Sequence, residues 1–311
     1  MRVIFFGTPA FAVPALAALL DSSHRVVGVV TQPDKPRGRG QKLSDAPVKA
    51  LALERGLVTL QPERLSRDAF ESDVRAVNAD LGVVAAYGKI LPEWLLQTPP
   101  FGMINVHASL LPKYRGAAPV HRAVINGDSE TGVTIMRVVK ALDAGPMMAR
   151  VIRGIGPDET SDVVERALAT LGASLLVRVV DDLAAGRAIE LPQNDLEATY
   201  APRLTKEEGR VDFSLPARAV HNRIRGLRPW PTAYTFLTGR RLVFHQARVS
   251  DHRAGSAAPG TCIAAGGQGI TIACGNDDAI DVMQIQPEGR RSMSARDYFA
   301  GHGTLVGQRF G

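Results

Sequence analysis

Short apolar runs alternate with amphipathic stretches through the first half of the chain. We expect strands at residues 2–6, 25–31, 57–60, 81–86, 102–107 and 131–138, and helices at residues 10–20, 47–55, 68–77 and 162–183. Several strand runs are apolar at successive positions, which is typical of strands buried on both faces. The alternation therefore predicts an α/β fold with a doubly wound, mostly parallel, Rossmann-like sheet.

The pattern changes near Ile189. Residues 190–207 are polar, contain prolines and lack periodicity, as an interdomain linker would. Gly-rich turns then separate short strand-like runs at residues 233–237, 241–249, 260–265, 269–274 and 280–286. We therefore expect a first domain over residues 1–189 and a small β-barrel (OB-like) domain over residues 208–311.

The composition is that of a folded globular protein, with 311 residues, 45% hydrophobic and 22% charged. The formal net charge of +6 favours a polyanionic partner, although many basic proteins bind none. Cys262 and Cys274 have no zinc-ligand spacing and form no disulfide framework, which suits a reducing cytoplasm. The apolar N-terminus is interrupted by Gly7, Pro9 and Pro14, so we expect a buried strand, turn and helix rather than a signal peptide. We also expect no membrane span and a monomer.

The first predicted strand lacks the dinucleotide fingerprint. Gly7 is followed by Thr8 and Pro9, so the pattern G-x-G-x-x-G is absent. The glycine-rich turn that holds a pyrophosphate is therefore missing, which argues against a dehydrogenase.

Asn105 and His107 alternate at the end of an apolar strand. Side chains two apart on a strand share a face, and ligand sites of open α/β sheets lie beyond the carboxyl ends of the strands. The following turn, S-L-L-P-K-Y-R-G-A-A-P, offers apolar side chains for a groove and backbone groups for a flat heterocycle. The alternative interpretation is a structural histidine beside a hydrophobic loop anchor.

Several blocks of this sequence resemble one family. They are F-F-G-T-P-A-F-A-V-P, T-Q-P-D-K-P-R-G-R-G-Q-K-L, V-V-A-A-Y-G-K-I-L-P, N-V-H-A-S-L-L-P-K-Y-R-G-A-A-P, E-T-G-V-T-I-M-R-V-V-K-A-L-D-A-G, K-E-E-G-R-V-D-F and R-P-W-P. Together they resemble the methionyl-tRNA formyltransferase family, within the folate-dependent formyltransferase superfamily, across essentially the whole chain. The Asn-x-His block marks the superfamily, while the basic loop, the linker and the C-terminal domain narrow the resemblance to the tRNA enzymes.

The resemblance implies transfer of a formyl group from 10-formyltetrahydrofolate to the α-amine of initiator methionyl-tRNA, through a tetrahedral intermediate and without a metal. It implies that Asn105, His107 and Asp143 are catalytic. The Asn105 amide would stabilise the oxyanion, and His107 would stabilise it and carry a proton to the departing folate nitrogen. Asp143, in the turn Leu142-Asp143-Ala144-Gly145, would fix the tautomer of His107 and favour its protonated form. Pro146 stands where many relatives have an acidic or polar residue, which restricts this loop but leaves Asp143 in place.

The resemblance also places the pterin of the folate between two loops. Backbone groups would read the heterocycle, and Leu and Ile side chains would sandwich it. The implied folate-binding residues are Tyr87, Gly88, Ile90, Ser109, Leu110, Leu111 and Pro112.

Two basic regions are candidates for contact with tRNA. Prolines and glycines in residues 34–42 predict a loop without regular structure, and its cations are Lys35, Arg37, Arg39 and Lys42. Such a loop is usually a solvated surface, but beside the catalytic strand it could order on an acceptor stem through phosphate contacts. The C-terminal domain contains no lysine after Lys206 and many arginines, including Arg223 and Arg225, and arginine suits bidentate phosphate contacts.

Two other functions remain open. A formyltransferase acting on a nucleotide sugar or a small amine would keep Asn105, His107 and Asp143, but it has no use for the basic loop or the arginine-rich second domain. A catalytically inert RNA-binding protein on a doubly wound scaffold would have no use for those three residues.

Replacing Arg37 and Arg39 by alanine is expected to weaken the use of tRNA. The salt dependence of binding should also flatten, because each lost phosphate contact lowers the log–log slope by somewhat under about one unit. Measuring the KM for charged initiator tRNA over a range of salt concentrations tests this, with folate affinity as the control. An unchanged KM and slope would make the loop a solvated surface and leave the C-terminal domain to bind tRNA alone.

Overall fold

The computed structural model describes residues 1–34, 36–37, 42–267, 269–302 and 305–311. The chain forms two compact units. The first unit contains residues 1–119, 131–153 and 165–201, and the second contains residues 120–130, 154–164 and 202–311. Each unit is described by itself.

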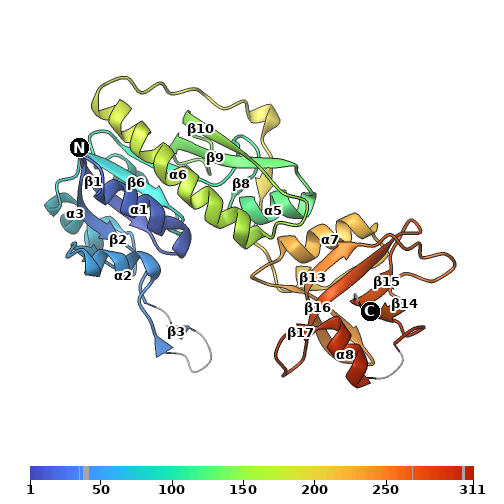
Figure 1. The fold of residues 1–311 in the computed structure, drawn as a ribbon. Coiled ribbons are helices and arrows are strands. Elements are labelled where there is room, and N and C mark those ends of the chain that lie inside the picture. Colours follow the sequence, from blue (N-terminus) through green and yellow to red (C-terminus); the bar gives the residue numbers. More distant parts are fainter. Residues whose placement is uncertain (35, 38–41, 268, 303–304) are drawn as a thin grey trace. The chain divides into compact units, whose positions relative to one another are not determined.

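The first unit is built on a seven-stranded sheet in the order β10-β9-β7-β6-β1-β2-β5 (Figure 1). Its strands are β1 Arg2–Gly7, β2 Arg25–Val30, β5 Thr59–Leu60, β6 Leu81–Ala85, β7 Met103–His107, β9 Glu130–Arg137 and β10 Met147–Gly154. The pairs β1–β2, β1–β6, β2–β5 and β6–β7 are parallel, and β7–β9 is antiparallel. The predicted mostly parallel Rossmann-like sheet is confirmed. Strand order reverses at β1, which has β2 on one side and β6 on the other.

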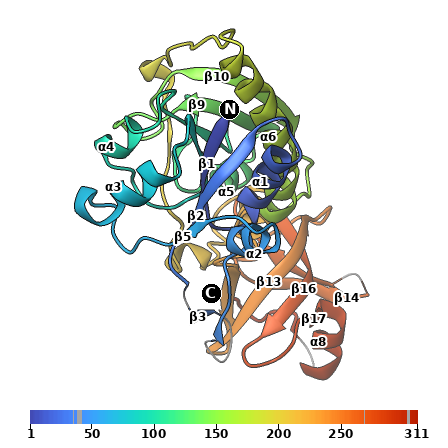
Figure 2. The same cartoon turned by 90° about the vertical axis from the view of Figure 1, so that its left-hand side faces the viewer.

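Helices cover both faces of this sheet. They are η1 Ala10–Ala12, α1 Val13–Leu20, α2 Pro47–Glu54, α3 Arg67–Ala76, α4 Glu93–Leu96 and α6 Ser161–Ala184. Helices α1 and α6 lie on one side of the sheet, and α3 and α4 lie on the other (Figure 2). Alternate residues of β1 serve the two faces, so that Ile4 and Phe6 pack against Phe70 and Val74 of α3.

Helix α6 packs closely on the strands that carry the predicted catalytic pair. A Cβ atom at Gly172 would lie 3.0 Å from Val106 Cγ1 and 3.2 Å from Val133 Cγ1. Because side chains alternate along a strand, Val106 faces α6 while Asn105 and His107 face the opposite way. The packing of α6 therefore determines which face of β7 presents polar groups.

Two short parallel strands lie outside the main sheet of the first unit. They are β8, Arg115–Gly116, and β11, Tyr200–Ala201. The 3₁₀ helix η2, Asp195–Glu197, immediately precedes β11. Residues 190–201, predicted as part of a linker, are thus anchored in the first unit.

The expectation that residues 34–42 lack regular structure is wrong in part. Strands β3, Pro36–Arg37, and β4, Lys42–Leu43, pair in antiparallel fashion. Proline is tolerated as the first residue of an edge strand, because no partner requires its missing N–H. Proline content alone therefore does not exclude so short a ribbon.

The second unit is an antiparallel sheet in the order β12-β13-β16-β15-β14, with β17 beside β16. Its strands are β12 Ala233–Leu237, β13 Arg240–Val249, β14 Cys262–Gly266, β15 Gly269–Ala273, β16 Ala279–Pro287 and β17 Met293–Ser294. Phe310 bridges Leu237 at one edge of the sheet, and Arg309 bridges Thr261 beside the other. These bridges close the sheet and confirm the predicted small barrel. The unit also contains α5 Pro119–Asn126, η3 Glu207–Gly209, α7 Ala217–Gly226 and α8 Ala295–His302.

Replacing Gly172 by leucine is expected to destabilise the first unit by about 1–3 kcal/mol. The added side chain has no room beside Val106 and Val133, so either the helix or the strands must shift. Thermal denaturation measures the loss, and Ser174→Leu, at an exposed position of the same helix, serves as the matched control. Equal melting temperatures for the two variants would contradict the close approach of α6.

Candidate active site

Asn105 and His107 lie at the carboxyl end of β7. Asn105 pairs with Val84 of β6 and with Met136 of β9, and His107 pairs with Thr134. His107 is 5% exposed, whereas Asn105 is half-buried. Within the described part of the chain, no hydrogen bond engages the Asn105 side-chain amide. Its N–H groups are therefore available to an oxygen of a bound substrate.

The His107 ring is held by a backbone carbonyl. Its Nε2 atom lies 2.9 Å from the carbonyl oxygen of Tyr114. A carbonyl oxygen only accepts hydrogen bonds, so Nε2 carries the proton in this contact. The other nitrogen, Nδ1, lies 3.7 Å from Asp143 Oδ2 and is the one that can take up or release a proton. No sequence pattern marks Tyr114, because its contribution comes from the main chain.

Asp143 reaches the site from the turn between β9 and β10. Its side chain is 15% exposed, and its Oδ2 atom accepts a hydrogen bond of 2.8 Å from the backbone N–H of Gly116. Its φ of 48° lies in the left-handed region, which aspartate tolerates better than most residues. The turn lies tightly against β9, since a Cβ at Gly145 would be 1.9 Å from the carbonyl oxygen of Arg137. The structure thus brings together His107 and Asp143, residues far apart in sequence.

Polar groups of the loop after β7 form hydrogen bonds within the loop and with Thr134 of β9. Ser109 Oγ donates to the Lys113 carbonyl at 2.6 Å. Thr134 Oγ1 donates to the Ser109 carbonyl at 2.7 Å and accepts from the Leu111 N–H at 3.2 Å. Ser109, Leu111 and Pro112 are buried, and the peptide before Pro112 is cis. Of the predicted folate residues in this loop, only Leu110 is partly exposed.

Of the predicted folate residues in the loop after β6, one is buried in the core and two lie at the surface. The Tyr87 ring lies edge-to-face with Phe6 at 5.6 Å between centroids, and burial raises the pKa of its hydroxyl to about 12. Gly88 and Ile90 are exposed, Ile90 by 87%. The Tyr87 carbonyl accepts a 2.7 Å hydrogen bond from Gln32 Nε2, a contact that sequence reasoning missed. This contact joins the loops after β2 and β6, on either side of the strand-order reversal.

The predicted tRNA contacts are only partly described. Lys35 and Arg39 lie outside the described residues, as do the side chains of Arg37 in β3 and Lys42 in β4. Arg223 is half-buried and donates from Nε to the Glu208 carbonyl at 2.9 Å.

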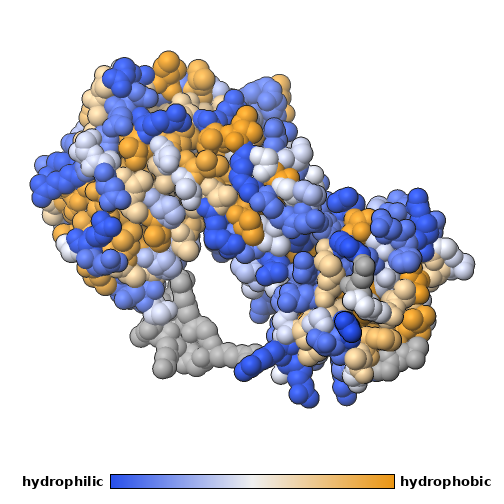
Figure 3. Space-filling view, in the orientation of Figure 1, coloured by the Kyte–Doolittle hydropathy of each residue, from blue (hydrophilic) through white to orange (hydrophobic). Residues whose placement is uncertain are grey.

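Arg225 is a structural residue of the second unit. It is 6% exposed and donates to Asn222 Oδ1 and to the carbonyls of Gly156 and Glu159. Burial lowers the pKa of its guanidinium. Its placement argues against a phosphate contact. Hydrophilic residues nevertheless predominate over α7 on the face shown in Figure 3.

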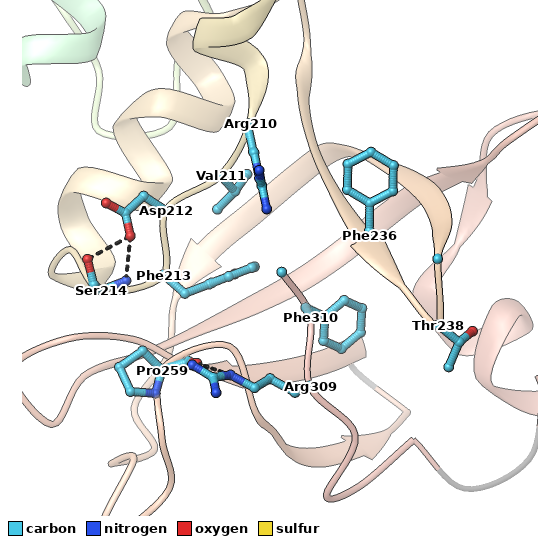
Figure 4. A pocket seen from close by; sticks show the side chains of 12 residues that line it. Arg210, Val211, Asp212, Phe213, Ser214, Phe236, Thr238, Pro259, Arg309 and Phe310 are labelled. Carbon is cyan, nitrogen blue, oxygen red and sulfur yellow. Dashed lines mark hydrogen bonds between the residues drawn. The ribbon is translucent and has the colours of Figure 1, made fainter.

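A cavity of about 750 Å³ lies in the second unit (Figure 4). Its walls carry the guanidinium groups of Arg210 and Arg309 and the rings of Phe213, Phe236 and Phe310. Asp212 accepts hydrogen bonds from the N–H and the hydroxyl of Ser214, and these bonds lower the pKa of its carboxyl group. No predicted site residue lines this cavity.

The cysteines and the metal-binding side-chain types of the described residues form no second reactive centre. Burial raises the pKa of the Cys262 thiol to about 11 and that of Cys274 to about 12, so neither is a thiolate at neutral pH. Among the described residues, no group of three or more His, Cys, Asp or Glu side chains is arranged to hold a metal ion. No described helix is long and apolar enough to cross a membrane.

Comparisons with known proteins show the family of this chain. The Formyl transferase family matches residues 1–180, and the Formyl transferase C-terminal domain matches residues 203–303. Methionyl-tRNA formyltransferases from Caldanaerobacter subterraneus and Methylococcus capsulatus are 46% and 45% identical, covering 97% and 100% of both chains. The fold resembles that of an N-formyltransferase from Helicobacter canadensis solved with folinic acid and dTDP-3-aminofucose, with a TM-score of 0.69 and 15% identity over 92% of this chain and 99% of that one. The chain therefore belongs to the formyl transferase family and, within it, to the methionyl-tRNA formyltransferases.

Proposed function

We propose that this protein transfers the formyl group of 10-formyltetrahydrofolate to the α-amine of initiator methionyl-tRNA, for translation initiation. The observation that carries the proposal is the 46% identity to a methionyl-tRNA formyltransferase over 97% of both chains. The alignment with this relative extends through the second unit at high sequence identity, which supports a tRNA acceptor over a small amine. His107, on the strand that also bears Asn105, lies within ion-pair distance of Asp143 in the turn after β9, and this supports catalysis over inert RNA binding.

The reaction requires a neutral amine to attack the formyl carbon. The carbonyl oxygen then gains negative charge in a tetrahedral intermediate, and the Asn105 amide is suited to donate a hydrogen bond to it. Collapse of the intermediate expels the folate nitrogen, which needs a proton. The Nε2–H group of His107 is held by the Tyr114 carbonyl. Its Nδ1 atom would receive a proton from the attacking amine and pass it to the departing folate nitrogen. The Asp143 carboxylate beside Nδ1 stabilises the charged ring in between. None of these steps requires a metal.

The folate donor is proposed to contact the loops after β6 and β7. Gly88, Ile90 and Leu110 are the predicted residues that are at least partly exposed there. Tyr87, Ser109, Leu111 and Pro112 would act by shaping those loops, since their side chains are buried. The folinic acid bound to the related N-formyltransferase supports a folate-derived donor.

We further propose that three segments of the chain have different roles. Residues 1–189 would perform the reaction, residues 190–207 would connect the domains, and residues 208–311 would contact tRNA. The exposed arginines of the last segment and the cations of residues 34–42 would bind phosphates. We propose that the protein acts in the cytoplasm as a monomer.

One assay separates the candidate functions. Purified protein is supplied with 10-formyltetrahydrofolate and, in parallel, charged initiator tRNA, free methionine or a nucleotide-linked amino sugar. Formylation of charged tRNA alone is expected. Preference for the amino sugar would favour the nucleotide-sugar enzyme, and tRNA binding without formyl transfer would favour the inert RNA-binding protein.

Replacing Asn105 by alanine is expected to lower kcat by about two orders of magnitude or more. The reason is that its amide acts on charge that develops only in the transition state. Folate affinity, measured by equilibrium titration, should remain nearly unchanged. A kcat close to that of the wild type would remove Asn105 from the mechanism.

His107 and Asp143 are expected to act as one unit. The double alanine variant should be little slower than the slower single variant, because residues that handle one proton together are not additive. Steady-state kinetics of all four proteins provides the test. Strictly additive losses would instead assign Asp143 a separate, structural role.

A further inference from the structure

The side-chain amide of Gln193 bridges the two ends of the turn that carries Asp143. Its Nε2 atom donates hydrogen bonds of 2.8 Å to the carbonyl oxygens of both Asp143 and Gly145. An amide nitrogen has two N–H groups, and both are used. Gln193 belongs to the segment predicted as a linker, 50 residues along the chain from Asp143.

Arg115 fixes the orientation of this amide. Its Nε and Nη2 atoms donate to Gln193 Oε1 at 3.0 and 2.8 Å, and Nη2 also donates to Asp195 Oδ1 at 2.6 Å. The Arg115 side chain is 5% exposed, and these partners offset the cost of burying its charge. Because a guanidinium only donates, the oxygen of the amide must face Arg115 and its nitrogen must face the turn.

The same short strand holds the Asp143 carboxylate directly. Gly116, next to Arg115 in β8, donates its backbone N–H to Asp143 Oδ2 at 2.8 Å. Asp143 is therefore held at its side chain by Gly116 and at its main chain by Gln193. The hydrogen bond from Gln193 to the Asp143 carbonyl matters because Asp143 has a positive φ. A non-glycine residue keeps that conformation only where its surroundings impose it.

We propose that Gln193 is a positioning residue for formyl transfer, which sets the distance between the Asp143 carboxylate and His107 Nδ1. This role rests on the proposed function of Asp143. Gln193 would touch neither substrate and would act only through the Asp143 turn. Loss of its N–H groups would let the turn relax, and the carboxylate would move away from the ring.

The informative variant is Gln193→Glu. Glutamate has nearly the same shape and still offers oxygen to Arg115, but it cannot donate to the two carbonyls. We expect kcat to fall roughly 10- to 100-fold, because displacements of the order of 1 Å have effects of that size. The KM values for 10-formyltetrahydrofolate and charged initiator tRNA should change by less than about twofold. Leu196→Ala, at a 96% exposed position of the same segment, is the control and should retain full activity.

The background of Asp143→Ala distinguishes positioning from general stability. If Gln193 acts through Asp143, adding Gln193→Glu to Asp143→Ala should cause no further loss of kcat. A further loss of the same size as in the wild type, or a wild-type kcat for Gln193→Glu, would overturn the positioning role. Gln193→Ala, which also lacks the donors, gives the same comparison if the glutamate variant does not fold.

The same measurements separate this inference from the proposed function. If Asp143→Ala lowers kcat while Gln193→Glu does not, only the positioning role is wrong. If Asp143→Ala leaves kcat unchanged, the role proposed for Asp143 is wrong, and the positioning role falls with it.

Discussion

The pairing of β8 with β11 is the constraint on which the candidate site depends. Arg115 N–H donates to the Thr199 carbonyl at 2.8 Å, and Ala117 N–H donates to the Ala201 carbonyl at 2.9 Å. Alternate N–H groups of a strand point in opposite directions, so the N–H of Gly116 points away from β11. That group is the one that binds Asp143 Oδ2. The short pairing thereby turns a backbone donor toward the Asp143 carboxylate.

The same pairing orients the His107 ring. Thr199 Oγ1 accepts from the Tyr114 N–H at 2.9 Å, and the Tyr114 carbonyl faces His107 Nε2. The close approach of the two strands requires glycine, since a Cβ at Gly116 would lie 2.8 Å from the Ala201 carbonyl oxygen and its φ is 121°. The side chains of His107 and Asp143 are thus both held by main-chain groups of residues 114–116. Main-chain groups suit this task because their positions depend little on side-chain rotamers.

The sequence predicted those features that depend on apolar periodicity. The buried strands β1, β2, β6 and β7 appear within a residue or so of the expected bounds, since uninterrupted apolar runs mark strands covered on both faces. Strand β10 was missed because it lies at the edge of the sheet and is nowhere fully buried. Helix α7 was missed although its buried Ala217, Val220 and Ile224 recur at helical spacing, because polar residues, namely His221, Asn222 and Arg225, are buried between them. Hydrogen bonds to Asn222 and to two carbonyls satisfy the buried Arg225.

The candidate site shows a second limit of sequence reasoning. Asn105, His107 and Asp143 were identified through motifs, but their supports were not, because Tyr114, Gly116 and Gln193 act through hydrogen bonds rather than through a pattern.

Segment 190–201 shows why the hydrogen-bond partners of polar residues could not be predicted. Its polar, aperiodic composition predicts a linker, on the assumption that water satisfies its polar groups. Gln193 lies 78 residues from Arg115 in the chain, and its amide instead satisfies a buried guanidinium and two carbonyls of a tight turn. A polar segment without hydrophobic periodicity can therefore be held firmly in place when a buried charge and backbone carbonyls are its partners. Composition shows only that such polar groups are present, whereas their hydrogen-bond partners depend on the fold.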